Sequence, residues 1–165
     1  MLSSRQTSKP RIYVDSIDAL EAAFHELIPI SKAMGVRVIS YNSDSLTTTA
    51  PLSQNINHQH SAFGGSLFSL AAMSGWGLIQ MKLSELLLDC NTVVMDGEVS
   101  YQSPVYDDLE CIVRLPENAD ALFAELEEKG TVRTELVATF ECNGKLAMQM
   151  KGRYHLKLRN SASET

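Results

Sequence analysis

Apolar and polar positions follow a helical period near the start of the chain. Between residues 17 and 28 the apolar side chains recur every three or four positions, which predicts an amphipathic helix. Pro29 is expected to kink or end this helix, because proline lacks the backbone N–H of a helix interior. A short strand is predicted at residues 36–41. The Thr-rich, polar residues 42–61 are interpreted as a loop.

The second half of the chain alternates apolar and polar residues, which is typical of strands with one buried face. The pattern predicts strands at residues 93–101, 109–115, 132–142 and 146–158, and a short helix at residues 119–129. In the predicted strand 93–101, Val93, Met95, Val99 and Tyr101 are expected on one face. Asn143-Gly144 separates the last two strands, and this dipeptide strongly favours a two-residue hairpin turn.

Charged residues are absent from one long segment. Residues 45–81 contain no Asp, Glu, Lys or Arg, a run of 37 residues in a chain of which 21% is charged. A helix in the second half of this run has no charged face, so the rest of the protein must enclose it. An antiparallel sheet curved around one buried helix is therefore predicted, which is an α+β fold class.

Composition indicates one globular domain. The chain has 165 residues, 44% of them hydrophobic, and at this length roughly two-thirds of the unfolded chain's surface can be buried. We expect one domain at residues 15–158, with a disordered polar tail at 1–14 and a polar tail at 159–165. The three cysteines are too widely spaced for a redox or zinc pair and are expected to be reduced, in a cytoplasmic protein; they are Cys90, Cys111 and Cys142.

Net charge and hydropathy argue against binding to nucleic acid and to membranes. The net charge is −6, with 20 acidic and 14 basic residues, which argues against a protein that binds nucleic acid. Residues 1–10 have no apolar core of a signal peptide. Residues 62–81 contain three Ser, four Gly and a Gln, so we interpret them as a buried helix and expect no membrane association.

Candidate chemistry lies immediately before this helix. Phe63-Gly64-Gly65-Ser66 places two glycines at the predicted helix start, where free N–H groups and the helix dipole favour an oxyanion or a phosphate. Alternatively, Gly64 and Gly65 only permit close packing of the helix entrance. His58 and His60 are interpreted either as surface residues or as substrate contacts. No metal site is predicted, because two histidines without a nearby acid or cysteine make a poor one.

Several short motifs carry a resemblance to a known family: Ala50-Pro51-Leu52, Phe63-Gly64-Gly65-Ser66-Leu67, Gly75-Trp76-Gly77 and Tyr101-Gln102-Ser103-Pro104-Val105. Over residues 15–157 the chain resembles the YiiD C-terminal-domain family, a thioesterase family of the hotdog-fold superfamily. The resemblance implies a curved antiparallel sheet wrapped around a central helix, and a homodimer or dimer of dimers with its site between subunits. It also implies hydrolysis of an acyl-CoA or acyl-carrier-protein thioester. No cofactor is implied beyond the CoA or phosphopantetheine of the substrate.

The family roles carry over incompletely. Many hotdog thioesterases have an Asn six residues before a His-Gly-Gly, and an Asp or Glu nine residues after that His. Asn57 matches the Asn, and Gly64 matches the glycine whose N–H polarises the thioester carbonyl. Phe63 stands at the His position and Ala72 at the acid position. The usual activation of water is therefore not available from residue 72.

The remaining candidates follow from position. Ser69, one turn before Ala72, and the loop residues His58 and His60 are the candidates to replace the acid; small-residue packing is the alternative role for Ser69. The candidate catalytic residues are Ser69, Asn57 to position the thioester or water, and Gly64 and Gly65 to bind the oxyanion through their N–H groups. The candidate substrate contacts are His58, His60, Phe63, Ser66 and Arg153. Arg153 belongs to a basic strand face that could meet CoA phosphates or an acidic carrier, or could be a solvated face. The alanine at 72 also favours a second hypothesis, a module that binds acyl thioesters or carrier protein without hydrolysis.

Overall fold

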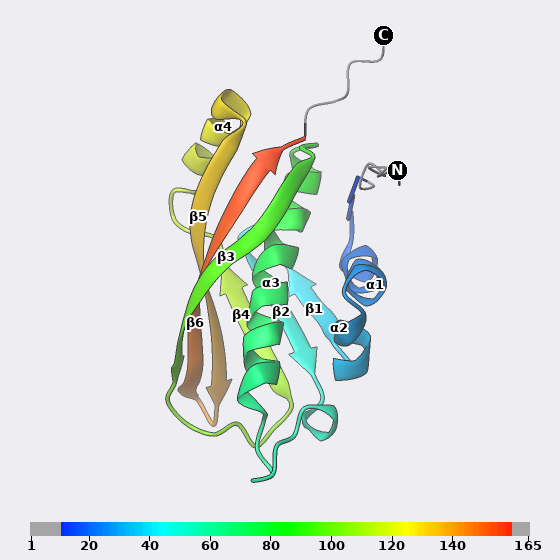
Figure 1. Cartoon of the computed structure of the whole chain (residues 1–165), viewed down its shortest axis with the longest axis vertical. Coiled ribbons are helices and arrows are strands. Elements are labelled where there is room, and N and C mark those ends of the chain that lie inside the picture. The colour runs from blue at the N-terminus through cyan, green and yellow to red at the C-terminus, as the bar shows by residue number, and fades with distance from the viewer. Residues whose placement is uncertain (1–10, 160–165) are drawn as a thin grey trace, which may run out of the picture.

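A six-stranded antiparallel sheet curves around one long helix in the computed structural model, which describes residues 11–159 (Figure 1). The helices are α1 (Ile17–Leu27), α2 (Pro29–Met34), α3 (Gly64–Glu85) and α4 (Ala119–Lys129), with a short 3-10 turn at Leu52–Gln54. The strands are β1 (Arg37–Tyr41), β2 (Ser45–Ala50), β3 (Cys90–Tyr101), β4 (Leu109–Arg114), β5 (Thr131–Cys142) and β6 (Lys145–Leu158). Their order in the sheet is β1-β2-β4-β5-β6-β3. The predicted α+β class and hotdog fold are confirmed.

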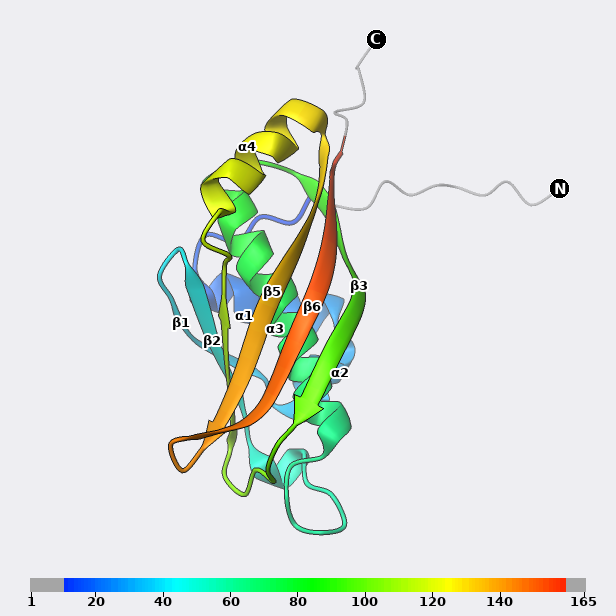
Figure 2. The ribbon, with the colours of Figure 1, turned by 90° about the vertical axis from the view of Figure 1, so that its left-hand side faces the viewer.

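Helix α3, which has no charged residue before Lys82, lies at the centre of the fold. Figure 2 shows β5, β6 and β3 passing across one side of it. Leu70, Leu78 and Ile79 are fully buried, as expected for a helix that contacts β2, β3, β4, β5 and β6. Each such side chain contributes about 1.5–3 kcal/mol by leaving water. The absence of charge in the sequence thus correctly predicted an enclosed helix.

Two glycines in the middle of α3 allow neighbouring side chains to reach its backbone. A Cβ atom on Gly75 would overlap the hydroxyl of Tyr154, which donates a hydrogen bond to the carbonyl oxygen of Ala72 at 3.0 Å. A Cβ atom on Gly77 would lie 2.6 Å from Cζ of Phe24 in α1. The Gly-Trp-Gly motif therefore permits close packing of α3 against β6 and α1.

The predicted hairpin joins β5 and β6. Asn143 and Gly144 both have positive φ, 53° and 71°, as a type I′ turn requires. The strands pair from Cys142 opposite Lys145 to Thr131 opposite Lys157, so the alternation in the sequence sets the register of the longest ladder.

One local prediction near the N-terminus was wrong and another was confirmed. Part of the expected loop 42–61 is β2, which pairs with both β1 and β4. Its threonines obscured the alternation, because Thr48 faces the core and its hydroxyl lies 2.7 Å from the Ser74 hydroxyl. The expected break at Pro29 is confirmed: α1 ends at Leu27, and Pro29 occupies the first position of α2, where the missing N–H has no helical partner to lose.

The alternation predicted for β3 breaks at a bulge. The register with β6 shifts between Val94 and Asp96, so Val93 points to the outer face while Val99 points toward α3. The prediction that Val93 and Val99 share a face was therefore wrong. Val93, Val94 and Met95 remain exposed by 45–46% on this strand, which within residues 11–159 pairs only with β6.

The predicted tails fall mainly on residues 1–10 and 160–165, which lie outside the described residues. Val14 packs into the core, and the backbone N–H of Arg159 donates to the carbonyl of Asp89 at 2.9 Å. Across residues 11–159, no helix is both long enough and apolar enough to cross a bilayer.

Candidate functional site

The first residues of α3 present two backbone donors. Within the described part of the chain, the N–H groups of Gly64 and Gly65 have no hydrogen-bond partner. The capping residue, Phe63, has no side-chain acceptor to offer, and its carbonyl oxygen accepts from Ser66 and Leu67 at 2.9 and 3.1 Å. The two free N–H groups and the positive end of the helix dipole favour an oxygen that carries negative charge.

A hollow of about 320 Å³ is lined in part by Gly64, the first of these two glycines. Its lining also includes Leu67 of α3, Tyr101 at the end of β3, and residues 102–105, which follow β3. The N–H of Ala62 donates to the carbonyl of Val105 at 2.8 Å, which holds this segment against the approach to the helix. The hollow is therefore bounded by elements that are fixed to one another.

Phe63 lies over the second glycine. Its side chain is 56% exposed, yet a Cβ atom on Gly65 would stand only 2.5 Å from Cε1 of the Phe63 ring. The ring therefore occupies space that any other residue at 65 would take. Gly65 is consistent with both roles considered from the sequence, because it permits close packing of the Phe63 ring and its N–H is free to bind an oxyanion.

Asn57 shapes the loop in front of α3. Its Oδ1 accepts from the N–H groups of Gln59 and Ser61 at 2.8 and 3.2 Å, and its Nδ2 donates to the Ser61 hydroxyl at 3.1 Å. His58 and His60 are exposed in the same loop. Among residues 11–159, no three His, Cys, Asp or Glu side chains come together as a metal site.

One face of α3 is only partly covered. Gly65, Ser69, Ala72 and Trp76 are half-buried and recur at helical spacing, so they form one stripe, which we call the open face of α3. Ser66 is also half-buried near its start. The structure thus places Ser69 beside Ala72, as predicted from spacing. Within the described residues, no acid or histidine is hydrogen-bonded to the Ser69 hydroxyl.

Arg153 lies away from the helix start. It is exposed on the outer face of the sheet, whereas its neighbour Tyr154 points inward. Its guanidinium binds the Asp96 carboxylate with Nε to Oδ1 at 2.7 Å, and this hydrogen bond lowers the pKa of Asp96. The structure does not bring Arg153 together with Gly64 or Ser66. Lys151 and Lys157 share its outward orientation, as predicted.

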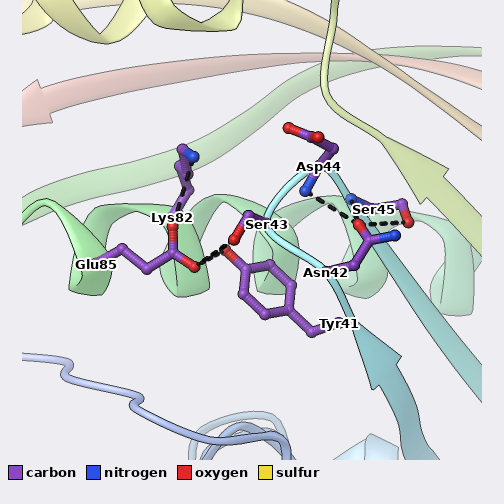
Figure 3. Close-up of polar contacts among 7 residues, drawn as sticks. All are labelled: Tyr41, Asn42, Ser43, Asp44, Ser45, Lys82 and Glu85. Atoms are coloured by element: carbon purple, nitrogen blue, oxygen red, sulfur yellow. Dashed lines mark hydrogen bonds and ion pairs between the residues drawn. The ribbon is translucent and has the colours of Figure 1, made fainter.

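A second polar cluster, at the other end of α3, has no motif in the sequence (Figure 3). The Glu85 carboxylate accepts from the hydroxyls of Tyr41 and Ser43 at 2.7 and 3.0 Å, and Lys82 Nζ lies 3.5 Å from its second oxygen. Burial alone would raise the pKa of Glu85, but these hydrogen bonds and Lys82 outweigh it and lower that pKa. Burial, followed by the bond to Glu85, raises the pKa of Tyr41.

Comparison with known families agrees with this geometry. A family model described as "Putative thioesterase (yiiD_Cterm)" matches residues 17–158. The chain belongs to this family. The match includes the α3 start, the open face of α3 and all six strands.

Several solved structures are similar to this chain over most of its length. A protein from Shewanella oneidensis, described as a "putative thioesterase", is 29% identical with a TM-score of 0.78, over 87% of this chain and 97% of its own. A protein of unknown function from Chlorobaculum tepidum TLS is 34% identical with a TM-score of 0.80, over 88% and 98%. A Pseudomonas aeruginosa thioesterase, at 13% identity and a TM-score of 0.68 over 92% and 100%, shares the fold.

Proposed function

We propose that the chain hydrolyses an acyl-CoA or acyl-carrier-protein thioester at the start of α3. The observation that carries the proposal is the pair of unpartnered N–H groups of Gly64 and Gly65 beside a hollow, in a member of a thioesterase family. Water adds to the carbonyl carbon and gives one proton to the solvent, so the former carbonyl oxygen of the tetrahedral intermediate carries the negative charge. The two N–H groups stabilise that oxyanion, after which the carbon–sulfur bond breaks and the thiolate leaves and takes up a proton.

The surroundings suggest how the substrate lies. Leu67 and Val105 offer the hollow an apolar wall for part of the acyl group. We assign Phe63, Ser66, His58 and His60 to its entrance as substrate contacts. Asn57 acts by holding the loop that carries the histidines. Arg153 lies on the outer face of the sheet. We assign it as a contact for CoA phosphates or an acidic carrier protein in a substrate that extends around β3.

The two sheet edges suggest how copies assemble. At the β1 edge, Glu21 Oε2 accepts from the N–H of Val38 at 2.9 Å, and a bulge follows before Ser40, so this edge is blocked. The β3 edge carries exposed Val94 and Met95 beside the open face of α3. We propose a cytoplasmic homodimer, or dimer of dimers, in which a second copy pairs along β3 and covers that face.

A second candidate function rests on Ala72. The open face of α3 has no carboxylate at this position, and Ser69 has no base bonded to it among the described residues. The same N–H groups would then hold a thioester carbonyl without cleaving it. The chain would act as a binding module for acyl thioesters or acyl-carrier protein.

Thiol release from a substrate panel tests the proposal. The panel contains acyl-CoA, acyl-pantetheine and acyl-carrier protein of several chain lengths, and sedimentation of the same sample gives the oligomeric state. Hydrolysis of acyl-CoA but not acyl-pantetheine would indicate recognition of the nucleotide. Binding of the panel without thiol release would contradict hydrolysis and support the binding module. A monomer at micromolar concentration would contradict the proposed assembly.

One substitution removes a single proposed donor. Gly64→Pro deletes the Gly64 N–H at the first position of a helix, where proline is favoured, and the ψ of 128° at Phe63 already suits a residue before proline. We expect turnover to fall roughly 100- to 1000-fold with little change in melting temperature. Gly64→Ala is the matched control, because it keeps the N–H. Equal turnover of the two variants would rule out this N–H as an oxyanion donor.

A further inference from the structure

Tyr101 contacts the start of α3 from the last position of β3. Its hydroxyl donates to the carbonyl oxygen of Gly64 at 2.8 Å. That carbonyl and the N–H of Gly65 belong to the same peptide group, whose atoms share one conjugated electron system. We propose that Tyr101 is a positioning residue, which strengthens and orients the Gly65 N–H that receives the thioester oxygen. The role in turnover rests on the proposed function, whereas the effect on the N–H does not.

The physical basis is cooperativity between hydrogen bonds. A donor on a peptide oxygen draws electron density toward that oxygen and makes the N–H of the same peptide a better donor, by about 10–30% for each bond. In an α-helix the Gly64 oxygen also accepts from the N–H four residues later, and its second lone pair is open to the Tyr101 hydroxyl. The Gly65 N–H therefore lies at the end of a hydrogen-bonded chain that begins at a side chain.

Tyr101 is held in place by its surroundings. The next two residues, Gln102 and Ser103, both donate their N–H groups to the carbonyl of Ala147, at 2.7 and 3.1 Å. The ring passes 3.4 Å from where a Cβ atom of Gly64 would be, so glycine gives the ring room. Partial burial raises the pKa of Tyr101, which keeps the hydroxyl protonated, and thus a donor, throughout the neutral pH range.

The chain contains a matched control for this bond. Tyr154 also donates its hydroxyl to a carbonyl of α3, that of Ala72, at 3.0 Å. The N–H of that peptide group belongs to Met73, in the helix interior, where the preceding turn supplies its acceptor. Tyr154 therefore makes the same kind of contact without a free N–H at the end of the chain of bonds.

The experiment compares Tyr101→Phe with Tyr154→Phe in the full-length protein. In Tyr101→Phe we expect the Gly65 amide proton resonance to move upfield in a ¹H–¹⁵N spectrum and kcat to fall about three- to ten-fold, with KM nearly unchanged. In Tyr154→Phe we expect no change at Gly65 and less than about a two-fold change in kcat. Placing 3-fluorotyrosine at 101, at a pH where it stays protonated, makes the hydroxyl a stronger donor and should move the Gly65 resonance downfield.

The two readouts separate this inference from the proposed function. An unchanged Gly65 resonance in both Tyr101 variants would overturn the inference, whatever the activity. A rise in KM at constant kcat would also overturn it, because Tyr101 would then contact the substrate directly. If the wild-type protein cleaves no thioester while the Gly65 resonance responds as expected, the proposed function fails and the effect of Tyr101 on the N–H stands. If Tyr101→Phe does not fold, the fluorinated protein decides the outcome.

Discussion

The polar groups at the two ends of α3 differ in whether they have hydrogen-bond partners within the chain. At the C-terminal end, the Glu85 carboxylate accepts from Tyr41 and Ser43 and lies near Lys82 (Figure 3). At the N-terminal end, two N–H groups have no partner among the described residues, beside an exposed Phe63. The Glu85 carboxylate thus has partners within the chain, whereas the two N–H groups have none among the described residues. Free N–H groups at the positive end of the helix dipole favour an anionic oxygen, so the N-terminal end is the better candidate for a site.

The largest expected effect of the three variants below is at the open end. Asn57→Ala removes the amide that holds residues 57–61 in front of α3, so turnover should fall roughly ten- to a thousand-fold. Steady-state kinetics on the best substrate of the panel measures this. Ser61→Ala is the control, because it removes the hydroxyl that Asn57 binds and keeps the Asn57 amide. An equal loss in both variants would mean that the bond to the Ser61 hydroxyl carries the effect, rather than the two backbone bonds that Asn57 Oδ1 accepts, and full activity in Asn57→Ala would contradict any role.

A gain is expected on the open face of α3. Ala72→Asp places a carboxylate at the position that is acidic in many hotdog thioesterases, on a half-buried face one turn from Ser69. If lack of a base limits hydrolysis, thiol release should rise about ten-fold or more. Ala72→Asn, of the same shape without the charge, should give no gain. A similar rate in the two variants would show that position 72 is not near the reacting carbon.

The smallest effect is expected at the closed end. Glu85→Gln should lower the free energy of unfolding at pH 7 by less than about 1 kcal/mol, because the side chain is partly exposed, and should leave turnover unchanged. The pKa of Glu85 is lowered in the folded state, so its contribution is present above the ordinary pKa of 4.5 and is lost as the pH falls through the lowered value.

Denaturation at pH 7 and pH 3 tests that sign. The difference in free energy of unfolding between the wild type and Glu85→Gln should be smaller at pH 3 than at pH 7. Glu127→Gln, on the exposed side of α4, serves as the control, since the Glu127 side chain makes no hydrogen bond or ion pair among the described residues. A larger difference at pH 3 than at pH 7 would contradict the assigned direction of the pKa shift.

The sequence predicted features that depend on local pattern. The uncharged run 45–81 identified the enclosed helix, and Asn143-Gly144 identified the hairpin between β5 and β6. It failed at β2, where a buried Thr48 has a partner in Ser74, 26 residues away. The bulge after Val94 was also missed, since one extra residue leaves no mark in composition.

For the candidate site, the sequence identified the glycines but not the contacts that support them. The hydroxyl of Tyr101 meets Gly64 across 37 residues, and Tyr41 meets Glu85 across 44. Such pairs depend on where the curved sheet brings its strands against α3, which no local spacing encodes. Tyr101 was visible only as part of a motif, without a role.

The two glycines of the Gly-Trp-Gly motif have a consequence for how relatives diverge. Gly75 leaves room for Tyr154, and Gly77 leaves room for Phe24, so each glycine is sterically tied to one large side chain on another element. A lineage that gains a side chain at 75 or 77 should therefore also replace its aromatic neighbour with a smaller residue. We expect positions 75 and 154 to vary as one pair and positions 77 and 24 as another. The Gly-Trp-Gly motif therefore sets the distance of α3 from β6 and α1. A relative can lose this motif without losing the chemistry of the helix start.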